Sequence, residues 1–189
     1  LARATVPQLQ GAVQQVGNQL GRLDVLVNCA SGARHVPALD YAETDWDEAL
    51  RTTLRASFFL CQAAGAYFRQ QGHGKIVNVA SLDAGPVIGP SVASMASNSG
   101  LLGLTRLLAN EWAPLGINVN CIIPGHMDID PAARPQGDER PDHPLLDRIP
   151  AGRLGTPHDL QGAVVYLASH ASDYVHGASL LVDGGWLVR

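Results

Sequence analysis

Short runs of β-branched and apolar residues alternate along this chain with longer segments of helical periodicity. This alternation is typical of βαβ units, which build a parallel sheet with helices on its faces. Strands are predicted at residues 24–28, 75–80, 117–123 and 179–183. Helices are predicted at residues 8–20, 45–68, 94–112 and 159–168. The pattern therefore predicts an α/β fold with about four parallel strands in one domain that spans residues 1–189.

Local signals refine two of these helices. Leu9, Val13, Val16 and Leu20 recur at helical spacing, so we expect them on one buried face. Asp45 followed by Glu48 has the spacing of a capping box, which predicts that the second helix begins there. Residues 126–147 are rich in proline and charge and are predicted to be an irregular loop of the kind that covers a substrate.

The composition excludes several classes of function. The formal charge of −4 argues against a basic surface for nucleic acid or anionic lipid. No run approaches the roughly 18 apolar residues of a membrane span, and the three cysteines, which we expect to be buried thiols, indicate a reducing compartment. The histidines lack metal-ligand spacing, so no metal site is predicted. We expect a cytoplasmic protein. Because residue 1 is Leu, the sequence is expected to be a piece of a longer chain.

Polar and turn-forming residues follow three of the predicted strands. Asn28, Ser81 and the pair Pro124–Gly125 all fall at carboxyl ends. In parallel α/β sheets, ligands bind in the crevice beyond those ends. The topology therefore predicts one shared site for these residues. His126 follows the Pro–Gly turn and either contacts a substrate or is a solvated loop residue.

These strand ends, taken with their sequence context, resemble the short-chain dehydrogenase/reductase family. The resemblance rests on residues 24–32, on 75–81, on 118–125 and on the C-terminal segments 147–153, 171–175 and 182–187. Together with residues 108–113, these segments are most similar to the branch of 2-deoxy-D-gluconate 3-dehydrogenases, which act on sugar acids. The resemblance implies the C-terminal part of a Rossmann-like, doubly wound sheet.

The resemblance also implies a catalytic set, of which this chain retains one member. Ser81 matches the catalytic serine, whereas Thr53, Ser94 and Asn98 occupy the positions of the family's asparagine, tyrosine and lysine. In the family the tyrosine exchanges a proton with the substrate, and the lysine lowers its pKa and holds the nicotinamide ribose. An aliphatic hydroxyl is too weak an acid for that exchange. The loss of a positioned acid–base group costs about 10²–10⁴ in rate.

The cofactor-binding residues implied by the resemblance are Asn28, Ala30, Pro124 and Gly125, with Ile129 where the family often has threonine. NAD or NADP is the implied cofactor. The Gly-rich phosphate loop of the first βαβ unit has no counterpart in this sequence, so roughly 60 residues of the family pattern are missing. Without them the strand at 24–28 is expected to be an exposed apolar edge.

Two functional interpretations follow; whether the chain is an enzyme is left undecided, and the missing tyrosine and lysine favour the first interpretation, an inactive protein. One is a family member with a degenerate site that does not transfer hydride and acts in binding or assembly. The alternative is an NAD(P)-dependent oxidoreductase that acts on a sugar acid or a similar hydroxy or keto substrate. In either case, the resemblance implies a homo-oligomer, a dimer or a tetramer, and a small sugar-acid-like ligand.

Overall fold

The computed structural model describes residues 4–30, 32, 34, 36–81, 91–128 and 146–188. Its four strands form one parallel sheet in the order β1-β2-β3-β4, the order of the sequence. The strands are β1 (Val25–Asn28), β2 (Gly74–Val79), β3 (Ile117–Pro124) and β4 (Ser179–Val182). The helices are α1 (Val6–Leu20), α2 (Glu43–Leu50), α3 (Ala56–Gln71), α4 (Val92–Trp112) and α5 (Pro157–Ala168). The predicted α/β class and parallel sheet are confirmed.

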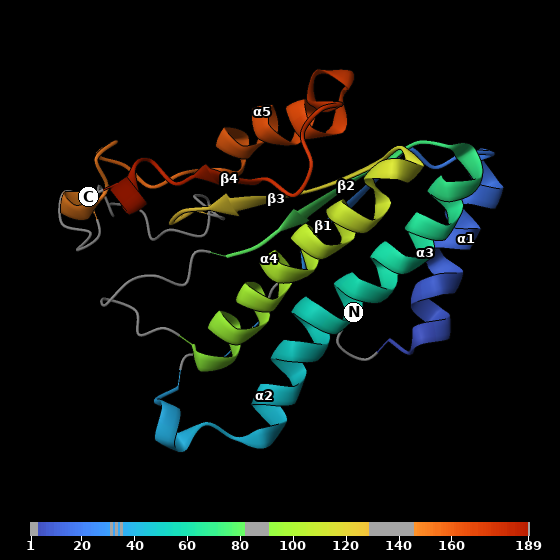
Figure 1. Cartoon of the computed structure of the whole chain (residues 1–189). Coiled ribbons are helices and arrows are strands. Elements are labelled where there is room, and N and C mark those ends of the chain that lie inside the picture. Colours follow the sequence, from blue (N-terminus) through green and yellow to red (C-terminus); the bar gives the residue numbers. More distant parts are fainter. Residues whose placement is uncertain are drawn as a thin grey trace.

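Helices cover both faces of the sheet. Figure 1 shows α3 and α4 side by side on one face, with α1 packed behind α3, and α5 alone on the opposite face. The carboxyl ends of β3 and β4 lie beside the C-terminal end of the chain in this view (Figure 1). This two-sided covering explains why residues on both faces of β3 are buried, Asn118 and Asn120 among them.

The core is divided between those two faces because successive strand residues point to opposite sides. On the α3–α4 face, Phe68 packs with Ile76 and Val119, all fully buried. On the α5 face, Val77 and Ile122 pack with Leu167. Two neighbouring residues of a strand, such as Ile76 and Val77, therefore pack against helices on opposite faces of the sheet.

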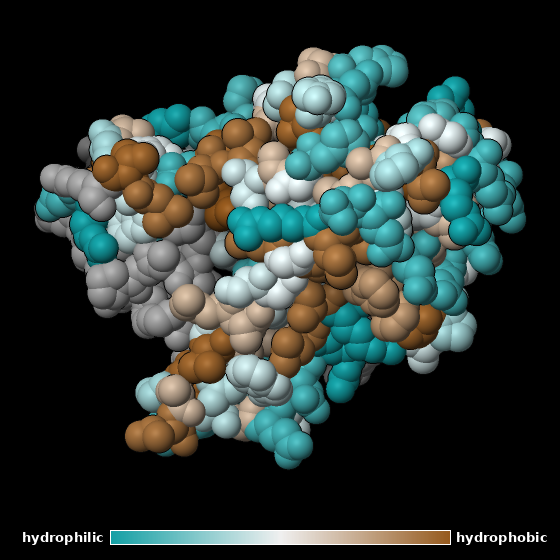
Figure 2. Space-filling model, in the orientation of Figure 1, coloured by the Kyte–Doolittle hydropathy of each residue, from teal (hydrophilic) through white to brown (hydrophobic). Residues whose placement is uncertain are grey.

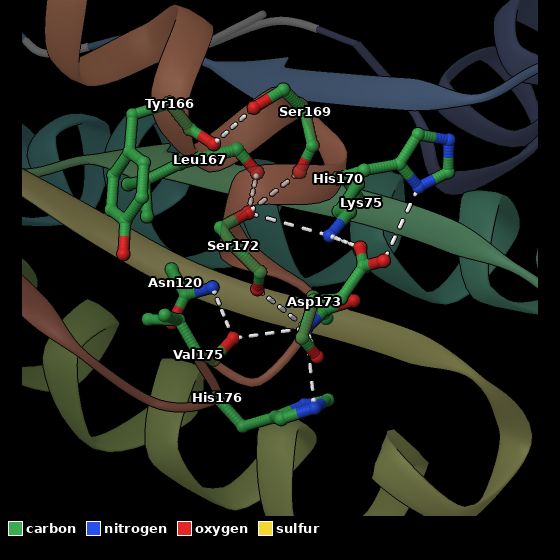
Figure 3. Close-up of polar contacts among 11 residues, drawn as sticks. Lys75, Asn120, Tyr166, Leu167, Ser169, His170, Ser172, Asp173, Val175 and His176 are labelled. Carbon is green, nitrogen blue, oxygen red and sulfur yellow. Dashed lines mark hydrogen bonds and ion pairs between the residues drawn. The ribbon is translucent and has the colours of Figure 1, made fainter.

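Hydrogen bonds and an ion pair attach the loop after α5, residues 172–175, to strands β2 and β3. The amide of Asn118 in β3 donates to the carbonyls of Asp173 and Val175, each at 3.0 Å. In Figure 3 the ammonium of Lys75 reaches both Ser172 and Asp173, at 3.3 and 2.6 Å. Because of this ion pair and the hydrogen bond from His170, the pKa of the Asp173 carboxyl is lowered. These contacts lie at the amino-terminal edge of the sheet, opposite the predicted site.

Three predictions about local structure are wrong. The second helix begins at Glu43, because the amides of Asp45 and Trp46 both donate to the carbonyl of Ala42, and the carboxylate of Asp45 pairs with Arg34 instead of capping. Val16 and Leu20 are exposed on α1, since that helix packs on α3 through Leu9, Val13 and Gly17. Cys29 is exposed, whereas Cys61 and Cys121 are buried as predicted.

The first strand is an edge among the described residues. On it, Val27 keeps 42% of its surface exposed, because no described element covers the α5 face of the sheet at that point. Most of the predicted irregular loop at 126–147, together with Ile129, lies outside the described residues. Within the described part, none of the helices combines the length and apolar character that crossing a bilayer requires.

Candidate active site

Ser81 lies directly beyond β2, where the sequence places it. The amide of the preceding residue, Ala80, continues the ladder by donating to the carbonyl of Ile122 at 2.9 Å. Ser81 is half-buried, and its hydroxyl makes no hydrogen bond to any residue that the structure describes. The hydroxyl is therefore available to a ligand at the carboxyl-end edge.

Asn98 joins the strand end to helix α4. Its side-chain oxygen accepts the backbone N–H of Ser81 at 2.9 Å. Its amide nitrogen donates to the carbonyl and the hydroxyl of Ser94, one turn earlier, at 3.0 and 3.1 Å. Asn98 is only 4% exposed. The structure thus brings together Ser81, Ser94 and Asn98, the three residues that the resemblance placed in one site.

Thr53 is buried in a short π-helical turn, Arg51–Arg55, between α2 and α3. Its carbonyl accepts the hydroxyl of Ser57 at 2.6 Å, so this turn is held internally. Single π-helical turns interrupt α-helices at functional sites more often than elsewhere. No periodicity in the sequence indicates this turn, because it inserts a single residue into an otherwise helical pattern.

Asn28 points away from the strand-end crevice and into the layer between the sheet and the helices. Its amide donates to Asn78, whose amide donates in turn to Thr105 on α4, each at 2.9 Å. Asn28, Asn78 and Thr105 are all buried, and their hydrogen bonds link β1, β2 and α4. A role for Asn28 in cofactor binding stays a prediction. Ala30, two residues further along, is half-buried.

Pro124 and Gly125 end β3 close against β4. The amide of Gly125 donates to the carbonyl of Val182, and a Cβ at Gly125 would lie 2.6 Å from the Cα of Asp183. Only glycine permits this approach. The following residue, His126, is half-buried and packs edge-on against Trp186, with ring centroids 4.5 Å apart. His126 therefore lies at the strand ends rather than in a solvated loop.

The buried cysteines and the possible metal ligands among the described residues give no further candidate site. Burial raises the pKa of the Cys61 thiol to about 12 and that of Cys121 to about 11, so neither is an activated nucleophile. No cluster of three or more possible metal ligands occurs among the described residues.

The resemblance implies a nicotinamide cofactor, and the described residues fit part of it. Ala30 follows β1, and Pro124 and Gly125 end β3, so all three lie at the carboxyl-end edge of the sheet. The hydroxyl of Ser81, which no described residue bonds, could donate to a ligand oxygen at that edge. Asn98 does not fit the ribose-holding role, because its oxygen and its N–H groups are engaged by Ser81 and Ser94. It also carries no charge.

A parallel sheet covered on both faces, with a polar cluster at the carboxyl ends of its strands, defines a Rossmann-like α/β protein. A family model described as "Enoyl-(Acyl carrier protein) reductase" matches residues 4–187. The chain belongs to the short-chain dehydrogenase/reductase family.

Two curated relatives are named 2-dehydro-3-deoxy-D-gluconate 5-dehydrogenase. The one from Escherichia coli is 48% identical over 90% of this chain and 68% of its own length. The one from Dickeya dadantii is 45% identical over 94% of this chain and 70% of its own length. The chain thus spans about two thirds of the length of these relatives.

Solved structures agree with the fold. A gluconate 5-dehydrogenase from Burkholderia cenocepacia, in complex with NADP and tartrate, superposes with a TM-score of 0.86 at 31% identity, over 98% of this chain and 72% of that one. A structure from Agrobacterium tumefaciens, described as a 2-deoxy-D-gluconate 3-dehydrogenase with bound NADP, superposes with a TM-score of 0.82 at 41% identity, over 98% of this chain and 75% of that one. The predicted resemblance to this branch of the family is confirmed.

Proposed function

We propose that this protein is an NAD(P)-dependent oxidoreductase that acts on a sugar acid or a similar hydroxy or keto substrate. The names of the similar proteins support this proposal, since they are sugar-acid dehydrogenases and two of the similar structures hold NADP. They favour the oxidoreductase over a protein without catalysis. The observation that carries the proposal is the position of Ser81 at the end of β2, where Asn98 holds its backbone N–H and none of the described residues bonds to its hydroxyl.

The proposal assigns a role to each candidate residue at the strand ends. Ser81 donates a hydrogen bond to the substrate oxygen at the carbon that is oxidised or reduced. Ala30, Pro124 and Gly125 would bound the nicotinamide ring, which supplies or accepts the hydride when it is bound. Ser94 stands where the family has its acid–base tyrosine, but its hydroxyl accepts from Asn98, and none of the described residues places a cation or a base beside it. The proton must therefore exchange with water.

Turnover by this chain is consequently expected to be slow. A positioned acid–base group contributes about 10²–10⁴ in rate, and this chain lacks one at the tyrosine position. The double variant S94Y/N98K supplies both the phenol and the adjacent ammonium. If the crevice is otherwise intact, this variant should gain rate by about the same factor.

The test is a rate measurement with D-gluconate, 2-deoxy-D-gluconate and 2-dehydro-3-deoxy-D-gluconate, each with NAD and with NADP in the appropriate oxidation state. We expect a slow reaction that S81A abolishes and that S99A, an exposed serine on α4, leaves unchanged. Reaction rates in the unmodified chain that are indistinguishable from those of cofactor and substrate alone, with every pair tested, would refute the proposal.

A second candidate is a binding or assembly role without hydride transfer. It is favoured by the closed contacts among Ser81, Ser94 and Asn98, which leave the Asn98 side chain no group to offer a cofactor. Binding of a sugar acid without turnover in the unmodified chain, together with turnover in the S94Y/N98K variant, would identify this second role.

Self-association fits either role. A groove of about 830 Å³ runs between the α2–α3 segment and α4. Figure 2 shows an apolar band along this part of the surface, where Leu107 is 61% exposed. We propose that this face joins two copies in a homodimer or a tetramer, and sedimentation as a monomer would contradict it.

We further propose a single domain over residues 1–189 and a cytoplasmic location, with no nucleic-acid or membrane partner.

A further inference from the structure

An arginine beside the C-terminal turn lies at the carboxyl-end edge of the sheet and has no carboxylate partner among the described residues. The guanidinium carbon of Arg148 lies 4.3 Å from the ring centre of Trp186. Trp186 follows β4 closely, and His126, its other ring neighbour, follows β3. This cluster of Arg148, Trp186 and His126 therefore stands at the ends of two strands, where sheets of this type bind ligands.

The indole that supports Arg148 is firmly held. Trp186 is only 6% exposed and packs with Ile149 and Leu154. The backbone N–H of Ala151 donates to the carbonyl of Gly184 at 3.0 Å and so joins the arginine's segment to the C-terminal turn. The guanidinium consequently has a preorganised platform.

The neighbouring charges are already engaged elsewhere. Arg153 pairs with Asp159 at 2.7 Å. The two oxygens of the Asp183 carboxylate accept the backbone N–H groups of Gly185 and Leu187, at 2.9 and 3.0 Å. Arg148 makes no ion pair with any residue in the described ranges. It is thus a cation at the edge of the crevice with no described carboxylate to neutralise it.

A guanidinium that stacks on an aromatic ring uses only its face. Its N–H donors point outward in the ring plane and match the two oxygens of a carboxylate. Such charge-assisted, bidentate hydrogen bonds are stronger than neutral ones. The arrangement is thus suited to select an anionic group on a small ligand.

We propose that Arg148, stacked on Trp186, binds the carboxylate of the acid substrate and is a specificity-determining residue of the site. This inference rests on the proposed function, because it assumes that the ligand of the crevice is a sugar acid. It predicts a preference for acids over neutral polyols of the same length. In this inference Arg148 does not bind the phosphates of the cofactor.

The experiment measures binding rather than turnover, so it separates this inference from the proposed function. Dissociation constants for D-gluconate, for its neutral analogue D-glucitol and for NADP are determined by ligand-observed NMR with the unmodified protein, R148Q, R148K and R69Q. R69Q is the matched control, because Arg69 is an exposed arginine near the end of α3 with no ion pair among the described residues. Thermal melting confirms that each variant is folded.

The unmodified protein should prefer gluconate to glucitol, and R148Q should weaken gluconate binding about ten- to hundredfold while leaving glucitol and NADP unchanged. R148K should lose part of the preference, because an ammonium retains the charge but not the planar fork. R69Q should resemble the unmodified protein. Retention of the gluconate preference in R148Q, absence of that preference in the unmodified protein, or weakening of NADP alone would each overturn the inference. Gluconate binding that depends on Arg148 without any hydride transfer would instead refute the proposed oxidoreductase while leaving the carboxylate site intact.

Discussion

Replacing Asn98 with alanine should destabilise the protein more than the same change at an exposed position on helix α4. N98A removes the two hydrogen bonds to Ser94 and leaves the backbone N–H of Ser81 without its acceptor. Each lost bond is worth about 1 kcal/mol net, and a poorly solvated N–H left unpaired costs about 1–2 kcal/mol more. We therefore expect a loss of about 3–4 kcal/mol in the free energy of unfolding.

The assay is urea unfolding followed by far-UV circular dichroism, with the slope m compared between variants to confirm that only stability changes. The melting temperature should fall by roughly 5–15 °C, since 1 kcal/mol corresponds to about 2–4 °C in a domain of this size. The matched control is N110A, because Asn110 is exposed on the same helix. A variant at that position should stay within about 0.5 kcal/mol of the unmodified protein.

The reasoning would be refuted if N98A were no less stable than N110A. That result would mean that the contacts of Asn98 are replaced by water without cost and that Ser81 is not held by them. A loss in N98A, together with faster hydrogen exchange at the amide of Ser81 alone, would show that the strand end depends on this side chain.

Two further predictions follow from the ionisable groups. In the native protein, maleimide at neutral pH should modify Cys29 alone and spare Cys61 and Cys121, which are buried and have pKa values raised to about 12 and 11; mass spectrometry that found three adducts before unfolding would contradict this. The guanidinium of Arg153 lowers the pKa of Asp159, so the contribution of this carboxylate should be present above the unfolded pKa of about 3.9 and be lost as the pH falls through the lower folded value. The stability difference between the unmodified protein and D159N should accordingly be present at pH 7 and shrink below about pH 4, and a difference that grew on acidification would be inconsistent with it.

The strands could be predicted because they are short segments rich in β-branched residues that alternate with longer helical segments. All four were expected within two residues of their observed bounds, and they form the expected parallel sheet. Helix starts were harder to predict, because they depend on which residue supplies the capping group. Thr5 and Gln8 form a reciprocal capping box that starts α1 earlier than the apolar spacing suggests, whereas the similar Asp45–Glu48 pattern lies inside α2.

The candidate site was predictable in address but not in detail. Topology alone placed Ser81 and Gly125 at one edge, and the resemblance added Ser94 and Asn98. The inward turn of Asn28 and the π-helical turn at Thr53 could not be predicted, since both depend on packing against α3 and α4. The stacking of Arg148 on Trp186 joins segments 38 residues apart and has no local sequence signal.

The central claim is that this chain itself transfers hydride between a nicotinamide and a sugar acid. The most direct test incubates the unmodified protein with reduced NADP or NAD deuterated at the transferred position and with 5-dehydro-D-gluconate, whose 5-keto group can accept the hydride, and measures deuterium in the gluconate formed by mass spectrometry. We predict slow incorporation of one deuterium per product molecule, absent in S81A. Unlabelled sugar acid after long incubation with both cofactors, under conditions in which the protein binds gluconate, would contradict the claim and leave the binding role as the better account.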